Sequence, residues 1–145
     1  MREFLKGAAL VLTVVSGARA QGVASASPDT MPANVAQRFV DAANARDVIA
    51  MAALVAPDAV FARFPDGRVI AEGRDSIRAH YARQLQSVPP DFRITVQLRI
   101  VERQIIIDQE RFTRAPGGRS QATWMYLVRD GLIRRAWVLD GTPPR

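Results

Sequence analysis

Hydrophobic and polar residues in the first half of the chain repeat with the period of an α-helix. Apolar residues recur every three or four positions over 35–43 and again over 77–85, which predicts two helices with one buried stripe each. A shorter helix is expected over 48–54, with Asp47 as its N-cap, and Asp75 is expected to cap the helix that follows. The inward positions predicted for the two longer helices are Val35, Phe39, Ala42, Ala43, Ile77, Tyr81 and Leu85.

The second half of the chain has the period of a β-strand. Residues 94–100 alternate strictly, which predicts a half-buried strand with its aliphatic side chains on one face: Ile94, Val96, Leu98 and Ile100. Further strands are expected over 105–114, 120–129 and 132–139, with hairpin turns between them. Pro57 and Asp58 are expected to end the second helix. An earlier hairpin is predicted after it, with one strand over 59–64, a turn over 65–67 and the partner strand over 68–71. Three helices and antiparallel strands predict an α+β layer fold.

The strand predicted over 120–129 is apolar on both faces. Tyr126 and Trp124 share one face, whereas Met125 and Leu127 share the other. The helices can cover only one of these faces, so a second subunit is the natural cover for the other. We therefore predict a homodimer, and the alternative is a strand buried within one subunit under long loops.

Residues 1–20 have the pattern of a cleavable export signal. A charged start precedes the short apolar run 7–15, and Ala18-Arg19-Ala20 places small residues at the positions that a signal peptidase recognises. A membrane anchor is the alternative, but the run has about half the length needed to span a bilayer. We expect cleavage before Gln21, export to the periplasm or secretion, a flexible leader over 21–32 and a domain over 33–141, with no membrane association after cleavage.

Composition narrows the chemistry of the expected mature chain. The formal charge is +6, and it falls to +4 when Arg2, Lys6, Arg19 and Glu3 are removed with the signal. This charge is spread along the chain, so we expect no nucleic-acid partner. Cysteine is absent, Lys6 is the only lysine and His80 the only histidine. These counts exclude thiol nucleophiles, Schiff-base lysines and histidine-rich zinc sites, and we expect no metal or cofactor.

Several segments resemble the nuclear transport factor 2-like superfamily. They are residues 35–47, 54–61 and 73–77, and the ending 126–133 followed by Trp137 is similar to the SnoaL-like and ketosteroid-isomerase-like branch. The resemblance covers nearly all of the expected domain. It implies a cone-shaped fold, in which three N-terminal helices pack on a curved antiparallel sheet around an apolar pocket at the open end. Because this fold has many functions, the resemblance alone assigns none.

The resemblance also argues against one activity of this branch. Ketosteroid isomerases use a tyrosine, a base aspartate and a protonated aspartate. The positions that correspond in this sequence are Phe39, Arg63 and, at or near the third, Trp124. Phenylalanine has no hydroxyl to donate, and arginine cannot accept a proton near neutral pH.

The candidate catalytic residues are Asp108, Glu110 and Tyr126. Asp108 and Glu110 lie two positions apart on one predicted strand, so their side chains share a face, and two carboxyls in an apolar cone form an acid–base pair. The SnoaL-like branch often has a histidine between such acids, where this chain has Gln109. Alternatively, the two acids are solvated or pair with Arg99 or Arg111. Tyr126 has a hydroxyl that can donate to a developing oxyanion.

The candidate ligand-binding residues come from several predicted elements: Phe39, Arg63, His80, Tyr81, Trp124 and Trp137. Arg63 can bind an anionic group, and each of the others is also explained by an ordinary structural role. The sequence therefore predicts an exported domain that binds a small apolar molecule. The alternative is a cofactor-free lyase, isomerase or cyclase with Asp108 or Glu110 as general base, and an accessory domain that meets another protein is a third hypothesis. Whether the protein is an enzyme remains open at this point.

Overall fold

The structure is a computed structural model that describes residues 27–141. The expected signal peptide and residues 21–26 of the expected leader lie outside these residues. Within the described part, none of the helices is long and apolar enough to cross a membrane. The elements are a 3₁₀ helix η1 (Pro28–Thr30), the helices α1 (Pro32–Asn44), α2 (Val48–Ala53) and α3 (Arg74–Ser87), and the strands β1 (Val55–Arg63), β2 (Val69–Glu72), β3 (Arg93–Glu102), β4 (Ile105–Arg114), β5 (Gly118–Arg129) and β6 (Leu132–Gly141).

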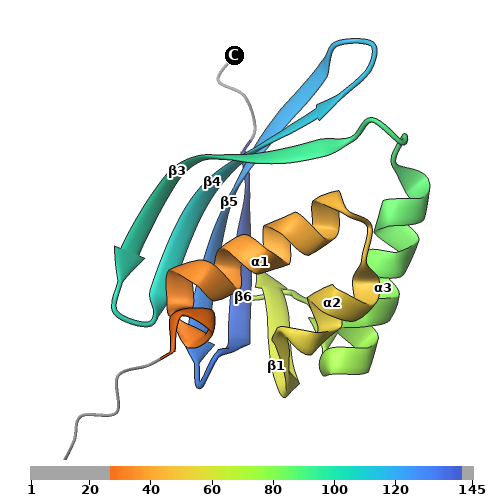
Figure 1. The fold of residues 1–145 in the computed structure, drawn as a ribbon. Helices are drawn as coiled ribbons and strands as arrows, with labels where there is room; N and C mark the ends of the chain where they lie inside the picture. Colours follow the sequence, from red (N-terminus) through yellow and green to blue (C-terminus); the bar gives the residue numbers. More distant parts are fainter. Residues whose placement is uncertain (1–26, 142–145) are drawn as a thin grey trace, which may run out of the picture.

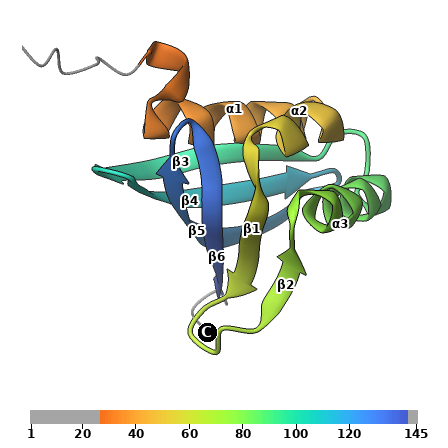
Figure 2. The same cartoon turned by 90° about the horizontal axis from the view of Figure 1, so that it is seen from below.

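The six strands form one sheet in the order β2-β1-β6-β5-β4-β3. β1 runs parallel to β6, and every other neighbouring pair is antiparallel. The sheet curves around α1, which crosses its concave face, while α3 lies beside β1 and β2 (Figures 1 and 2). The α+β class and the three helices on a curved sheet are therefore confirmed, and one parallel pair is added to the predicted antiparallel sheet.

The core lies between α1, α3 and the concave face of the sheet. The helix stripes supply much of it, because Val35, Phe39, Ala43, Ile77 and Leu85 are buried as predicted and Tyr81 packs against them half-buried. The N-cap of α2 is also as predicted: the Asp47 side chain accepts hydrogen bonds from the backbone N–H groups of Ile49 and Ala50, at 3.1 and 2.8 Å. Local sequence patterns thus determined the helices and their buried faces.

Three local predictions are wrong. Asp75 does not cap α3, because Gly73, at φ 82°, lets the helix begin at Arg74 and leaves Asp75 in its first turn. Pro57 and Asp58 do not end α2 but lie within β1, at an irregularity in its pairing with β6, where the missing N–H of proline is tolerated. Pro28–Thr30, assigned to the leader, forms η1, and the Pro28 carbonyl accepts a hydrogen bond from the Asn34 side chain at 2.7 Å.

The most consequential difference lies in β3. Its register against β4 shifts between Val96 and Leu98, so that the strict alternation of the sequence is interrupted by a β-bulge. Beyond the bulge every side chain changes face. Leu98 and Ile100, predicted to be buried, are therefore 55% and 49% exposed, whereas Arg99 points to the concave face.

Candidate active site

A cavity of about 540 Å³ opens between the concave face of the sheet, α3 and the β1–β2 hairpin. This volume is in the range of small-molecule sites. Most of its wall is apolar. Helices α1 and α3 and the sheet all contribute side chains to it, among them Phe39, Ile70, Leu85, Phe112, Trp124 and Val138. The cavity agrees with the expected apolar pocket of the cone.

An aromatic cluster forms one wall of the cavity. The ring of Phe39 meets that of Tyr81 edge-on with centroids 5.4 Å apart, and it meets Tyr126 at 6.2 Å. Trp124 stacks on Tyr126 at 5.8 Å, nearly parallel. Interlocked rings of this kind have few alternative packings, so they give the wall a defined shape.

Glu110 is the acidic side chain that lines this cavity within the described residues. It is only 3% exposed, and its carboxyl accepts a hydrogen bond from the Tyr126 hydroxyl at 3.1 Å. The pKa of Glu110 is raised to about 8, mainly by burial. The Tyr126 hydrogen bond and the charge of Arg99 oppose this rise, and the charge of Asp108 adds to it. At neutral pH this carboxyl is mostly protonated, yet it can ionise near pH 8.

The two cavity tyrosines keep their protons. Burial raises the pKa of Tyr81, and the nearby Glu110 carboxylate raises it further. The pKa of Tyr126 is raised in the same way, by burial first and then by Glu110. Both hydroxyls are therefore hydrogen-bond donors at any pH at which the protein works, although that of Tyr126 already donates to Glu110.

Asp108 does not share the cavity with Glu110. It is completely buried, and both of its carboxylate oxygens accept hydrogen bonds from the Arg99 guanidinium, from Nε and Nη2, at 2.7 Å each. Arg99 also donates to the Ala33 carbonyl and the Gln37 side chain of α1. Of the alternatives left open by the sequence, pairing with Arg99 therefore holds for Asp108 and not for Glu110. Asp108 is thus a structural partner that stabilises the contact of β3, β4 and α1.

The other predicted site residues divide into two groups. Phe39, Arg63, His80, Tyr81 and Trp124 line the cavity, together with Tyr126. Trp137 does not: it pairs with Met125 on the opposite, convex face of the sheet. Its strand position was predicted correctly, but the sequence did not show that this side of β6 faces away from the helices.

The three positions that correspond to the ketosteroid isomerase groups, Phe39, Arg63 and Trp124, all lie on the cavity wall. The resemblance therefore located the cavity correctly, although this chain has other side chains at these positions than the isomerases have.

One residue of the cavity wall and one irregularity in the sheet were not predicted from the sequence. Arg68 lines the cavity beside Arg63, because its carbonyl accepts a hydrogen bond from the Arg63 N–H at 2.8 Å across the β1–β2 turn. The predicted hairpin could have indicated this neighbour. Arg99 was named from the sequence as an alternative partner of the two acids, but no sequence signal identified the bulge that turns it toward Asp108. Within the described residues, no group of three or more His, Asp or Glu side chains is arranged to hold a metal ion.

Comparisons with known proteins identify a family and several similar folds. Residues 36–136 match the family model of the SnoaL-like domain. No curated protein matches the sequence. Three solved structures resemble it at low sequence identity. An NTF2-like protein from Cytophaga hutchinsonii has a TM-score of 0.63 and 16% identity, and the match covers 77% of this chain and 90% of that one. A proposed ketosteroid isomerase from Kribbella flavida has a TM-score of 0.61 and 24% identity, with 81% of this chain and 83% of that one covered. A proposed polyketide cyclase from Sinorhizobium meliloti has a TM-score of 0.62 and 20% identity, with 73% of this chain and 94% of that one covered. The resemblance predicted from the sequence is confirmed by the family model. The likeness to the three solved structures, at these low identities, concerns the fold alone.

Proposed function

We propose that this chain, which belongs to the SnoaL-like domain family, binds a small, largely apolar molecule in its cavity and moves a proton on it with Glu110 as general base. One observation carries the proposal: a buried carboxyl with a pKa of about 8 lines an apolar cavity. A structural carboxylate needs no such environment, whereas acid–base catalysis near neutral pH depends on a group whose pKa lies in this range.

The proposed reaction is a proton transfer at carbon beside a carbonyl group. The ionised form of Glu110, about one tenth of the molecules at pH 7, takes the proton from carbon. The electron pair of the C–H bond moves toward the carbonyl oxygen as an enolate. Glu110 then returns the proton to another atom of the same molecule, which gives an isomer. Alternatively, the enolate carbon attacks a second carbonyl carbon of the same molecule to close a ring, the π pair of that C=O bond moves to its oxygen, and Glu110 returns the proton to this alkoxide. These outcomes correspond to an isomerase and a cyclase, and neither requires a cofactor.

Tyr81 is the hydroxyl that we assign to the developing oxyanion. It lines the same cavity as Glu110, and its pKa is raised by burial first and then by the Glu110 carboxylate. Tyr126, the donor first considered from the sequence, instead holds the Glu110 carboxyl in place. A fixed donor in a water-poor cavity stabilises an enolate more than water does.

Deuterium exchange tests the proposal without knowledge of the natural substrate. The protein is incubated in D₂O with a panel of cyclic and aromatic ketones, and deuterium uptake at carbon is followed by mass spectrometry. Glu110→Gln should lower the exchange rate roughly 100-fold or more, while Glu102→Gln, at an exposed glutamate, should leave it unchanged. The rate should rise with pH and level off above about pH 8. Equal exchange by the wild type and Glu110→Gln would exclude Glu110 as the base.

Binding without catalysis is the second candidate. It is favoured by the pairing of Asp108 with Arg99, which leaves a single acid on the cavity wall among the described residues. On this alternative, ketones that bind in the cavity would take up deuterium no faster than in buffer.

We also propose export and a homodimer. Export is supported by the signal pattern of residues 1–20, and intact-mass measurement of protein from an expressing bacterium should show Gln21 as the first residue. The homodimer is supported by apolar side chains on the convex face of the sheet, where Leu98 and Ile100 are exposed and Met125 and Trp137 are half-buried.

A further inference from the structure

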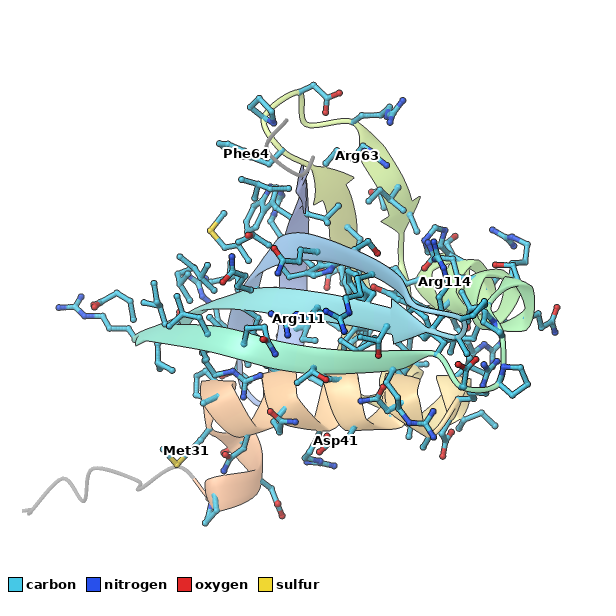
Figure 3. The ribbon with its side chains drawn as sticks, turned by 90° about the horizontal axis from the view of Figure 1, so that it is seen from above. Met31, Asp41, Arg63, Phe64, Arg111 and Arg114 are labelled. Atoms are coloured by element: carbon cyan, nitrogen blue, oxygen red, sulfur yellow. The ribbon has the colours of Figure 1, made fainter. Side chains whose placement is uncertain are left out.

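The mouth of the cavity is basic, although its wall is apolar. Arg63 and Arg68 flank the turn of the β1–β2 hairpin, and His80 approaches from α3. Figure 3 shows Arg63 beside Phe64 at the end of β1, on the side of the molecule far from α1. Arg68 is exposed, and Arg63 and His80 are half-buried. Within the described residues, the remaining charged side chain of the wall is the buried Glu110.

We infer that the cavity takes an amphipathic anion: an aromatic or alicyclic carboxylate, with its carboxylate held by Arg63 and Arg68 and its apolar body against Phe39, Tyr81 and Trp124. This inference rests on the proposed function, since it names the class of molecule that the cavity binds. It adds the polarity of the ligand and its orientation, neither of which follows from the proton transfer.

The geometry of arginine supports this assignment. A guanidinium carries five N–H donors in a planar fork that matches a carboxylate, so Arg63 can hold an anion while it keeps its contacts within the protein. Arg63 and Arg68 are backbone neighbours across the hairpin, and both line the cavity. One anion at the mouth can therefore be held by both guanidinium groups.

Burial determines which end of the molecule enters first. A carboxylate beside the aromatic cluster would lose its hydration without gaining a cation, which is costly. At the mouth it stays near both arginines and solvent. The apolar body therefore points inward, and its reacting carbon comes to the region of Glu110 and Tyr81.

Calorimetry with two probes of equal shape tests the inference. The probes are 2-naphthoate and its neutral counterpart 2-naphthamide, titrated into the wild type at pH 7. We expect 2-naphthoate to bind roughly 10- to 100-fold more tightly. The double variant Arg63→Gln/Arg68→Gln should remove this difference and keep the binding of 2-naphthamide. The matched control Arg78→Gln/Arg103→Gln loses the same charge at exposed positions away from the cavity, and should keep the difference.

His80 gives a second readout that needs no variant. It is the only histidine of the chain, so its imidazole signals are unambiguous in an NMR titration. Burial lowers the pKa of His80, and the charge of Arg83 lowers it further. A bound carboxylate at the mouth should raise this pKa, whereas 2-naphthamide should not. Equal affinity of the two probes, with an unmoved His80, would overturn the anion assignment and leave the proposed function standing. Binding of neither probe would overturn both.

Discussion

Replacing Glu110 by glutamine should stabilise the protein at alkaline pH and leave its stability unchanged in acid. The folded-state pKa of Glu110 is about 8, against an ordinary value of 4.5. Between these two pH values the unfolded chain has released the proton and the folded chain has kept it. The stability that the protonated Glu110 contributes is therefore fully present below pH 4.5 and is lost as the pH rises through 8.

The size of the effect follows from the width of this pH window. Each pH unit between the two pKa values lowers the free energy of unfolding by about 1.4 kcal/mol. This penalty is therefore roughly 3 kcal/mol at pH 7 and roughly 5 kcal/mol at pH 9. Glutamine has the shape of the protonated carboxyl and can still accept the Tyr126 hydrogen bond. It has no proton to lose, so the variant should escape the penalty and exceed the wild type by at least about 2 kcal/mol at pH 9.

Urea unfolding followed by tryptophan fluorescence measures this difference at pH 4, 7 and 9. Glu102→Gln is the matched control, because its side chain is 78% exposed and its removal should change stability equally at all three values. Other groups titrate alike in the wild type and in Glu110→Gln, so they cancel in the comparison. If the gain of Glu110→Gln over the wild type is the same at pH 4 and pH 9, Glu110 is not held in its protonated form and the reasoning fails.

Three further predictions concern the fold and its assembly. Arg99→Met should lower the free energy of unfolding by about 3–5 kcal/mol, because it leaves Asp108 buried without its cation; a loss below about 1 kcal/mol in urea unfolding would contradict the role given to this pair. Phe39→Ala should cost about 3–5 kcal/mol by the same measurement, since it removes the ring shared by the core and the cavity wall. The mature protein should sediment as a dimer and its Met125→Glu variant as a monomer, and a monomeric wild type would refute the proposed dimer.

Much of the fold could be predicted from local patterns. The helical stripes identified Phe39 and Ile77 as core residues, and the N-cap preference of aspartate identified the start of α2 at Asp47. The alternation of β4 placed Asp108 and Glu110 on one face, and both are buried there. These features depend on neighbours a few positions away in the chain, which a sequence displays directly.

The different environments of Asp108 and Glu110 were decided only by the tertiary structure. The bulge in β3 turned Arg99 toward Asp108, while Glu110 was left against Tyr126 at the cavity. Arg68 reached the cavity mouth, and Trp137 lay outside it, because of how the strands pair and curve. The pKa of a carboxyl depends on its burial and on charges within a few ångströms, and these come from residues far away in sequence. Local periodicity therefore determined which two acids share a face, and the packing of distant strands decided which of them lines the cavity.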